Sequence, residues 1–135
     1  MKKVLLCLAA IAYSFALHAQ CSSPINHWES CVLDNMTWKY KVPTAAIPNW
    51  QQPTFNDAAW ASGIGGMGYG DGDDNTLVPN GTVTVYMRKT FTIIDTSVIR
   101  SAVFCMDFDD GFVAYLNGKE IARSNMNANQ QWNSL

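Results

Sequence analysis

Residues 108–123 read F-D-D-G-F-V-A-Y-L-N-G-K-E-I-A-R, and this stretch decides the fold class. Two runs of alternating apolar and polar side chains meet at Asn117-Gly118. A two-residue turn of type I′ needs positive φ at both central residues, which Gly adopts without steric cost and Asn tolerates better than most residues. The stretch therefore predicts an antiparallel hairpin, with strands over residues 112–116 and 119–122.

Two longer runs before the hairpin also carry strand patterns. Apolar and polar side chains alternate over residues 83–93, with Lys89 as the one charge on the apolar side. A period of two predicts a half-buried strand, with a bulge or an extended lysine stem at that charge. Residues 101–108 are apolar on both sides and predict a strand in the middle of a packed sheet. Cys105 is expected to pack there as a small hydrophobic residue.

The segment from residue 36 to residue 72 gives weaker signals. A strand is expected over residues 36–42, and Pro43 ends it because proline cannot donate to a ladder. The glycine-rich stretch 63–72 predicts a loop, while Trp38 and Trp60 are expected in the core. Helical periodicity is absent after the first 19 residues. The sequence therefore predicts an all-β fold, an antiparallel β-sandwich of the jelly-roll type.

The N-terminal residues predict export. Residues 1–19 begin with two lysines, continue through a short apolar run and end in small residues, which is the pattern of a secretory signal peptide. The apolar run is too short to anchor the chain, so no transmembrane segment is expected after its removal. We therefore expect a secreted or cell-surface protein. Cys21 and Cys31 are predicted to form a disulfide in that oxidising environment, and lipid attachment at Cys21 is the alternative.

Three regions follow from these signals: the signal peptide, a short polar segment over residues 20–35, and a β-sandwich module over residues 36–135. The module is expected to be incomplete at its C-terminus, because the sequence after Arg123 is polar and a jelly roll would need further strands. Without Lys2 and Lys3, seven basic residues remain against eleven acidic ones. Such a chain has no basic stripe, so nucleic-acid binding is not expected.

Several sequence blocks occur in a fixed order along the chain. They are W-K-Y at 38–40, F-N-D at 55–57 with Trp60, G-I-G-G-M-G-Y-G-D-G-D-D-N-T at 63–76, Y-M-R-K-T-F at 86–91, D-D-G at 109–111, Y-L-N-G at 115–118 and R-S-N-M at 123–126. As a set they resemble one family, the galactose-binding-like jelly-roll modules of large secreted bacterial proteins of the Bacteroidetes type. The resemblance implies a sandwich whose loops at one end can bind carbohydrate, often with a structural calcium ion, and further domains downstream in the same polypeptide. It implies no catalytic residue.

An acidic loop within the third block is the candidate metal site. Asp71, Asp73, Asp74 and Asn75 place oxygen atoms at closely spaced positions, and Ca²⁺ needs six to eight oxygen ligands. The loop is not an EF-hand, because the glycine and the glutamate of that motif are missing. The competing interpretation is a turn in which Asp and Asn side chains bond their own backbone.

Carbohydrate contacts are predicted from loop aromatics and from the polar residues around the hairpin. Trp50 and Tyr69 could stack on a sugar face, although Trp50 could equally clamp its loop to the sheet. Asp109 and Asp110 could bind sugar hydroxyls together with Arg123. Alternatively, Asp110 turns the chain while Asp109 accepts backbone amides or pairs with Arg88 or Arg123.

The sequence carries no nucleophile with its base and no phosphate loop. It therefore favours a non-catalytic module of an exported multidomain protein that recognises a glycan or a cell-surface polymer. Two alternatives stay open. The chain could be the N-terminal accessory part of a secreted hydrolase or phosphoesterase, or it could be a structural adhesion or spacer domain.

Overall fold

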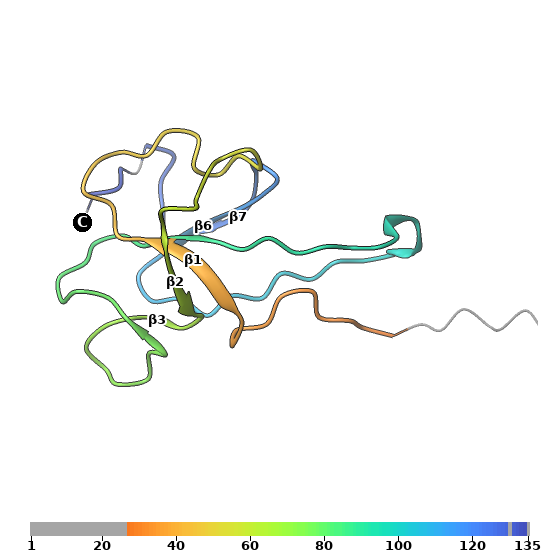
Figure 1. Cartoon of the computed structure of the whole chain (residues 1–135), viewed down its shortest axis with the longest axis horizontal. Helices are drawn as coiled ribbons and strands as arrows, with labels where there is room; N and C mark the ends of the chain where they lie inside the picture. The colour runs from red at the N-terminus through yellow and green to blue at the C-terminus, as the bar shows by residue number, and fades with distance from the viewer. Residues whose placement is uncertain (1–26, 130, 135) are drawn as a thin grey trace, which may run out of the picture.

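The computed structural model describes residues 27–129 and 131–134. The predicted signal peptide lies outside these residues, and so does Cys21, the predicted disulfide partner of Cys31. The described part contains seven strands and one turn of 3-10 helix (Figure 1). These are β1 Thr37–Lys41, β2 Ala61–Ile64, β3 Met67–Gly68, β4 Thr76–Leu77, β5 Tyr86–Arg88, η1 Thr96–Val98, β6 Phe112–Leu116 and β7 Lys119–Ser124.

Three small sheets make up the fold. The first has the order β2-β1-β5 and is antiparallel throughout, with Trp38 opposite Gly63 and Lys39 opposite Arg88. The second pairs β3 with β4 in parallel, and the third is the antiparallel hairpin β6-β7. The all-β class expected from the sequence is therefore confirmed, with mostly antiparallel pairing.

The hairpin forms where the sequence places it. Asn117 has φ 52° and Gly118 has φ 82°, so both central residues of the turn take the positive values that type I′ requires. β7 continues to Ser124, two residues beyond the predicted end, and a bulge between Ala114 and Tyr115 shifts the register. The strand predicted at 36–42 is also confirmed, as β1.

An aromatic cluster joins the first sheet to the hairpin. The ring of Trp50 stacks on Tyr86 of β5 at 4.6 Å and meets the edge of Tyr115 of β6 at 5.5 Å. Trp60 packs between Phe55 and Tyr86 and is only 8% exposed, which confirms its expected place in the core. Burial raises the pKa of the Tyr86 phenol, and the neighbouring Tyr115 adds to the effect. We call the part of the molecule that contains the three sheets the body. This cluster, residues 50, 55, 60, 86 and 115, lies at its centre.

The glycine-rich stretch is more ordered than expected. It contains part of β2 and all of β3, so the predicted loop is wrong at residues 63–64 and 67–68. A Cβ at Gly63 would lie 2.6 Å from the Thr76 side chain, whose hydroxyl donates to the Ile64 carbonyl at 2.7 Å. Asn75 Nδ2 likewise donates to the Gly65 carbonyl at 2.8 Å. Here glycine permits two segments to approach closely, which propensity alone does not reveal.

Of the two long strand predictions, the one over residues 83–93 is confirmed only in part and the one over residues 101–108 is wrong. Only Tyr86–Arg88 of the run 83–93 is paired, and residues 101–108 form no strand. Cys105 is exposed rather than packed in a core. Residues 89–108 instead extend from the body as two legs joined at η1, and we call this segment the arm (Figure 1). The arm has strand-like sequence without the neighbouring strands that burial requires.

Candidate functional site

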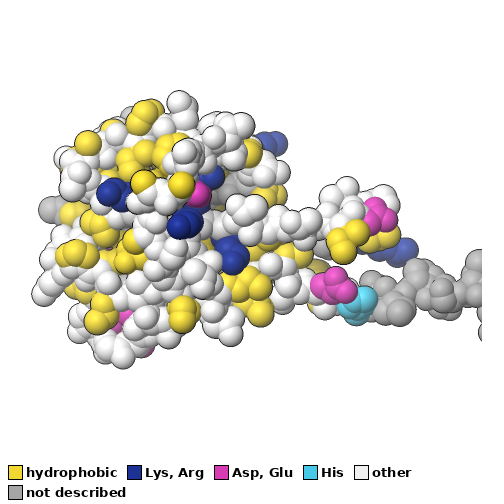
Figure 2. Space-filling view, in the orientation of Figure 1, with side chains coloured by type: hydrophobic (Ala, Val, Ile, Leu, Met, Phe, Trp, Pro, Cys, Tyr) yellow, Lys and Arg dark blue, Asp and Glu magenta, His cyan; other side chains and the backbone are white. Residues whose placement is uncertain are grey.

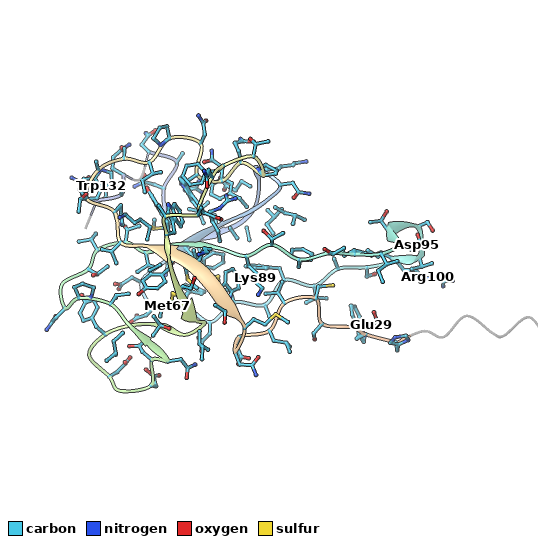
Figure 3. All side chains as sticks on the ribbon, viewed as in Figure 1. Glu29, Met67, Lys89, Asp95, Arg100 and Trp132 are labelled. Carbon is cyan, nitrogen blue, oxygen red and sulfur yellow. The ribbon has the colours of Figure 1, made fainter. Side chains whose placement is uncertain are left out.

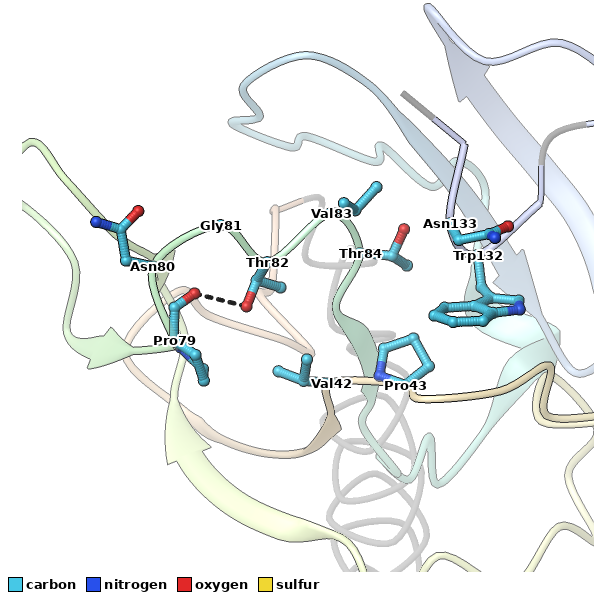
Figure 4. Close-up of a pocket in the computed structure, with 10 residues that line it drawn as sticks. All are labelled: Val42, Pro43, Pro79, Asn80, Gly81, Thr82, Val83, Thr84, Trp132 and Asn133. Carbon is cyan, nitrogen blue, oxygen red and sulfur yellow. Dashed lines mark hydrogen bonds between the residues drawn. The ribbon is translucent and has the colours of Figure 1, made fainter.

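A shallow hollow of about 240 Å³ lies where the chain leaves β1, close to the C-terminal residues (Figure 4). The turn at residues 79–82 forms one wall. Thr82 holds this turn together by donating to the Pro79 carbonyl from its amide, at 3.1 Å, and from its hydroxyl, at 2.7 Å. Gly81 allows this turn by taking φ 82°. The lining is Val42, Pro43, Pro79, Asn80, Gly81, Thr82, Val83, Thr84, Trp132 and Asn133.

The side chains of the hollow are uncharged and of mixed polarity. The indole of Trp132 lies beside Pro43 at one end, with Thr84 and Asn133 next to it (Figure 4). Asn80 adds a second exposed amide at the other end. An aromatic face with neighbouring amides and hydroxyls can pack against the apolar side of a neutral polar ring and hydrogen-bond its edge.

Sequence reasoning missed this hollow. Its three segments, around residues 42, 82 and 132, are separated by about 40 to 50 positions, and none of them carries a motif. Trp132 lies in a polar tail that predicted no strand. Only the fold reveals that the tail returns to the end of β1.

The predicted sugar-stacking aromatics lie apart from this hollow. Trp50 belongs to the aromatic cluster, where Tyr86 covers one ring face and Tyr115 meets it edge-on. The interpretation of Trp50 as a clamp between loop and sheet therefore matches its contacts. Tyr69 lies in the turn after β3 and is 40% exposed.

The acidic residues before the hairpin form a turn. Asp109 Oδ1 accepts from the Asp110 amide at 2.9 Å, and the Asp109 carbonyl accepts from Gly111 at 2.9 Å. Asp110 takes φ 63°, and its carbonyl accepts from Asn125 at 2.8 Å. These contacts match the turn-forming interpretation of both aspartates.

Of the two kinds of partner left open for Asp109, a backbone amide is the one observed, while Arg88 and Arg123 pair with other carboxylates. Arg88 Nε donates to Asp57 at 2.8 Å, while Arg123 makes two 2.8 Å bonds to Glu120. The Arg123 guanidinium holds the pKa of Glu120 below its ordinary value.

Arg88 positions the loop between β1 and β2. Its guanidinium donates to the carbonyl of Trp50 and, at 3.1 Å, to that of Gln52, in addition to the Asp57 pair. It also lies over the Phe55 ring, 5.3 Å from the centroid. A second hollow of about 290 Å³ beside this arginine contains Lys39 and Lys89, which bind backbone carbonyls. The charges there are therefore occupied in holding the fold.

Three of the four predicted metal ligands converge, whereas the amide nitrogen of the fourth, Asn75, donates to the Gly65 carbonyl. One carboxylate oxygen from each of Asp71, Asp73 and Asp74 lies within 4.8 Å of the others. Asp71 and Asp73 share a hydrogen bond that lowers the pKa of Asp71 and raises that of Asp73, to which repulsion from Asp71 also contributes. The pKa of Asp74 is raised, first by desolvation and then by repulsion from Asp71. Asp74 Oδ2 has no hydrogen-bond partner within the described residues.

No family model, curated protein or solved structure matches this chain. Among the described residues, no helix has the length and the apolar character needed to cross a membrane.

Proposed function

We propose that this chain is a non-catalytic β-sandwich module, of the jelly-roll type, in an exported multidomain protein, and that it recognises carbohydrate at a cell surface. The observation that carries the proposal is the uncharged hollow at Trp132. The module would act by binding, and it would place other domains of the same polypeptide near a glycan or a cell-surface polymer.

The chemistry of the hollow favours a neutral sugar over other ligand classes. A phosphate or a carboxylate would need a cation, and the lining contains neither Lys nor Arg. A purely apolar ligand would make no use of the exposed amides of Asn80 and Asn133, which would stay bound to water. A pyranose ring offers both an apolar face for the Trp132 indole and hydroxyls for these amides. The shallow shape favours a terminal or an internal residue of a polymer over an enclosed small molecule.

Glycan binding by the full chain tests this proposal. We expect a glycan array to show binding that Trp132→Ala abolishes and Trp132→Phe retains in part. Trp28→Ala is the matched control, because Trp28 is 73% exposed and lies far from the hollow in the sequence. An intact fold without binding to any polysaccharide would contradict the proposal and favour the structural or spacer role.

Calcium is the cofactor we propose for the acidic loop. Three carboxylates in close proximity repel one another, and a divalent cation relieves that repulsion. Because a ligand that binds only the folded state raises its stability, calcium should raise the melting temperature of the chain. The rise should disappear with excess chelator and in Asp71→Ala and Asp73→Ala. Melting that is independent of calcium would leave these aspartates as turn formers.

A further inference from the structure

The arm is the most exposed apolar part of the described chain. It carries more than half of the large exposed apolar side chains, with Ile94 fully exposed and Val103 at 68%. Within residues 89–108, the one backbone hydrogen bond is that of the turn at η1. The backbones of the two legs are not hydrogen-bonded to each other or to the body. Figure 2 shows apolar side chains at the outer part of the arm, beside acidic and basic ones. Such a surface is typical of an interaction site.

The second leg of the arm, residues 99–108, and the acidic turn that follows it at residues 109–110 have a charge pattern that selects one kind of partner. Arg100 stands at its outer end, near the tip (Figure 3), whereas Asp107, Asp109 and Asp110 stand at its inner end. Residues 101–106 between them are uncharged. A second leg of the same sequence, placed antiparallel, brings each arginine to the acidic end of the other leg. A parallel placement would instead oppose like charges, which is destabilising.

We propose that the second leg pairs with the same leg of a second copy of this chain, as an antiparallel strand about a two-fold axis. We place the two-fold axis perpendicular to the paired strands, through one residue position. The residue at that position lies opposite the same residue of the other copy. Residues equally far before and after it in the sequence lie opposite each other. We place that axis at Cys105, midway between Arg100 and Asp110. Each guanidinium then lies next to the acidic turn of the other copy, where Asp110 has φ 63° and stands outside the ladder. Phe104 then lies opposite Met106, and Ala102 lies opposite Phe108.

This pairing provides what the leg lacks in the single chain. Its backbone amides and carbonyls gain ladder partners. Its apolar side chains gain neighbours across the strand pair, in addition to the contact that Phe104 and Phe108 make with Phe112 of β6. The interface is isologous, so both copies use the same edge of the second leg and the pair closes at two copies. It uses the arm and the acidic turn after it, and the hollow at Trp132 does not take part.

Mass and cross-linking together test the proposal. Light scattering of the full chain, with Cys7, Cys21 and Cys31 replaced by Ser, should give twice the mass of one copy. Oxidation with copper phenanthroline and dioxygen should then join two Cys105 thiols into one disulfide, with two electrons passing to the oxidant. The matched control also carries Cys105→Ser and Ser97→Cys, which moves the thiol to the tip. This control should form little cross-linked dimer.

Charge reversal provides a second, independent test of the proposal. Arg100→Glu places like charges at both ends of the pair and should raise the dissociation constant on the order of tenfold. Arg100→Lys keeps the charge and should leave it close to the original value. A monomer at all concentrations would overturn the proposal and assign the arm to strands of another polypeptide. A broad distribution of larger species, or equal cross-linking in the Ser97→Cys control, would also overturn it.

Discussion

The body and the arm differ in structure although their sequences are alike. Residues 86–88 and residues 101–108 both have strand-forming composition, yet only the first set is paired. Tyr86–Arg88 lies beside β1, whereas the arm has no strand beside it within the described residues. β-propensity is a preference for a pleated and half-buried surface, so it has no effect where no such surface exists. The comparison teaches that neighbours determine which strand-like residues form strands.

The boundary between body and arm follows from the length of β1. Arg88 lies opposite Lys39, so continuation of this register would bring Thr90 opposite Thr37, the first residue of β1. From Phe91 onward, β1 has no residue left to pair. Lys89 marks the transition, since its ammonium donates to the Thr37 carbonyl at 2.9 Å. The alternating pattern of 83–93 therefore continues past the point where pairing ends.

The largest expected difference between body and arm concerns buried volume. Trp60→Ala removes a ring that is 8% exposed and contacts Phe55 and Tyr86, so unfolding free energy should fall by roughly 3–5 kcal/mol. Ile94→Ala in the arm removes a fully exposed side chain and should change it by less than about 0.5 kcal/mol. Urea unfolding followed by tryptophan fluorescence measures both. Similar losses would show that the arm is part of the core.

A smaller loss is expected from the arginine at the boundary. Arg88→Met removes the donor to Asp57 and to two loop carbonyls, and it leaves Asp57 half-buried without its cation. We expect a loss of about 2–3 kcal/mol in unfolding free energy. Lys41→Met removes an exposed cation from the neighbouring β1 and should cost no more than about 0.5 kcal/mol. Equal effects would place Arg88 among ordinary surface charges.

Sequence reasoning succeeded where the signal was local. The type I′ turn depends on only two residues, Asn117 and Gly118, both of which adopt positive φ. The end of β1 depends on Pro43, which has no amide to donate to a ladder. The strand prediction over residues 101–108 failed because an apolar run forms a central strand only where other strands are present on its two sides. The sequence of the run itself does not contain that information. The hollow at Trp132 was missed for the same reason, since only the fold brings its three segments together.

The turn of the body hairpin allows a separation of two costs. A Cβ at Gly118 would meet the side chain of Gln52 at 2.6 Å, and the residue also has φ 82°. Gly81 has the same φ but open space around it. Gly81→Ala should therefore cost about 1 kcal/mol from backbone strain alone. Gly118→Ala should cost only slightly more, because the end of the flexible Gln52 side chain can move aside. Thermal unfolding of the two variants checks this. A larger loss at Gly81 would contradict the assignment of the hairpin as part of the stable body.

The smallest expected effect is local to the tip of the arm. Asp95 caps η1, where its carboxylate accepts from the Ser97 amide at 2.9 Å and from the Ser97 hydroxyl at 2.6 Å. These bonds lower the pKa of Asp95, the hydroxyl having the larger effect. A lowered pKa in the folded form means that the cap is fully present above the ordinary carboxyl pKa and is lost as pH falls through the lowered value.

The amide resonance of Ser97 should follow that titration, and Asp95→Asn should remove it. In the body, the pKa of Glu120 is lowered by Arg123, so its signals should move in the same acidic range and stay unchanged in Asp95→Asn. If the Ser97 amide instead moves at the ordinary carboxyl pKa, the cap is absent in solution. The tip then has no folded structure of its own, and within residues 27–129 every ordered element would depend on a neighbouring strand.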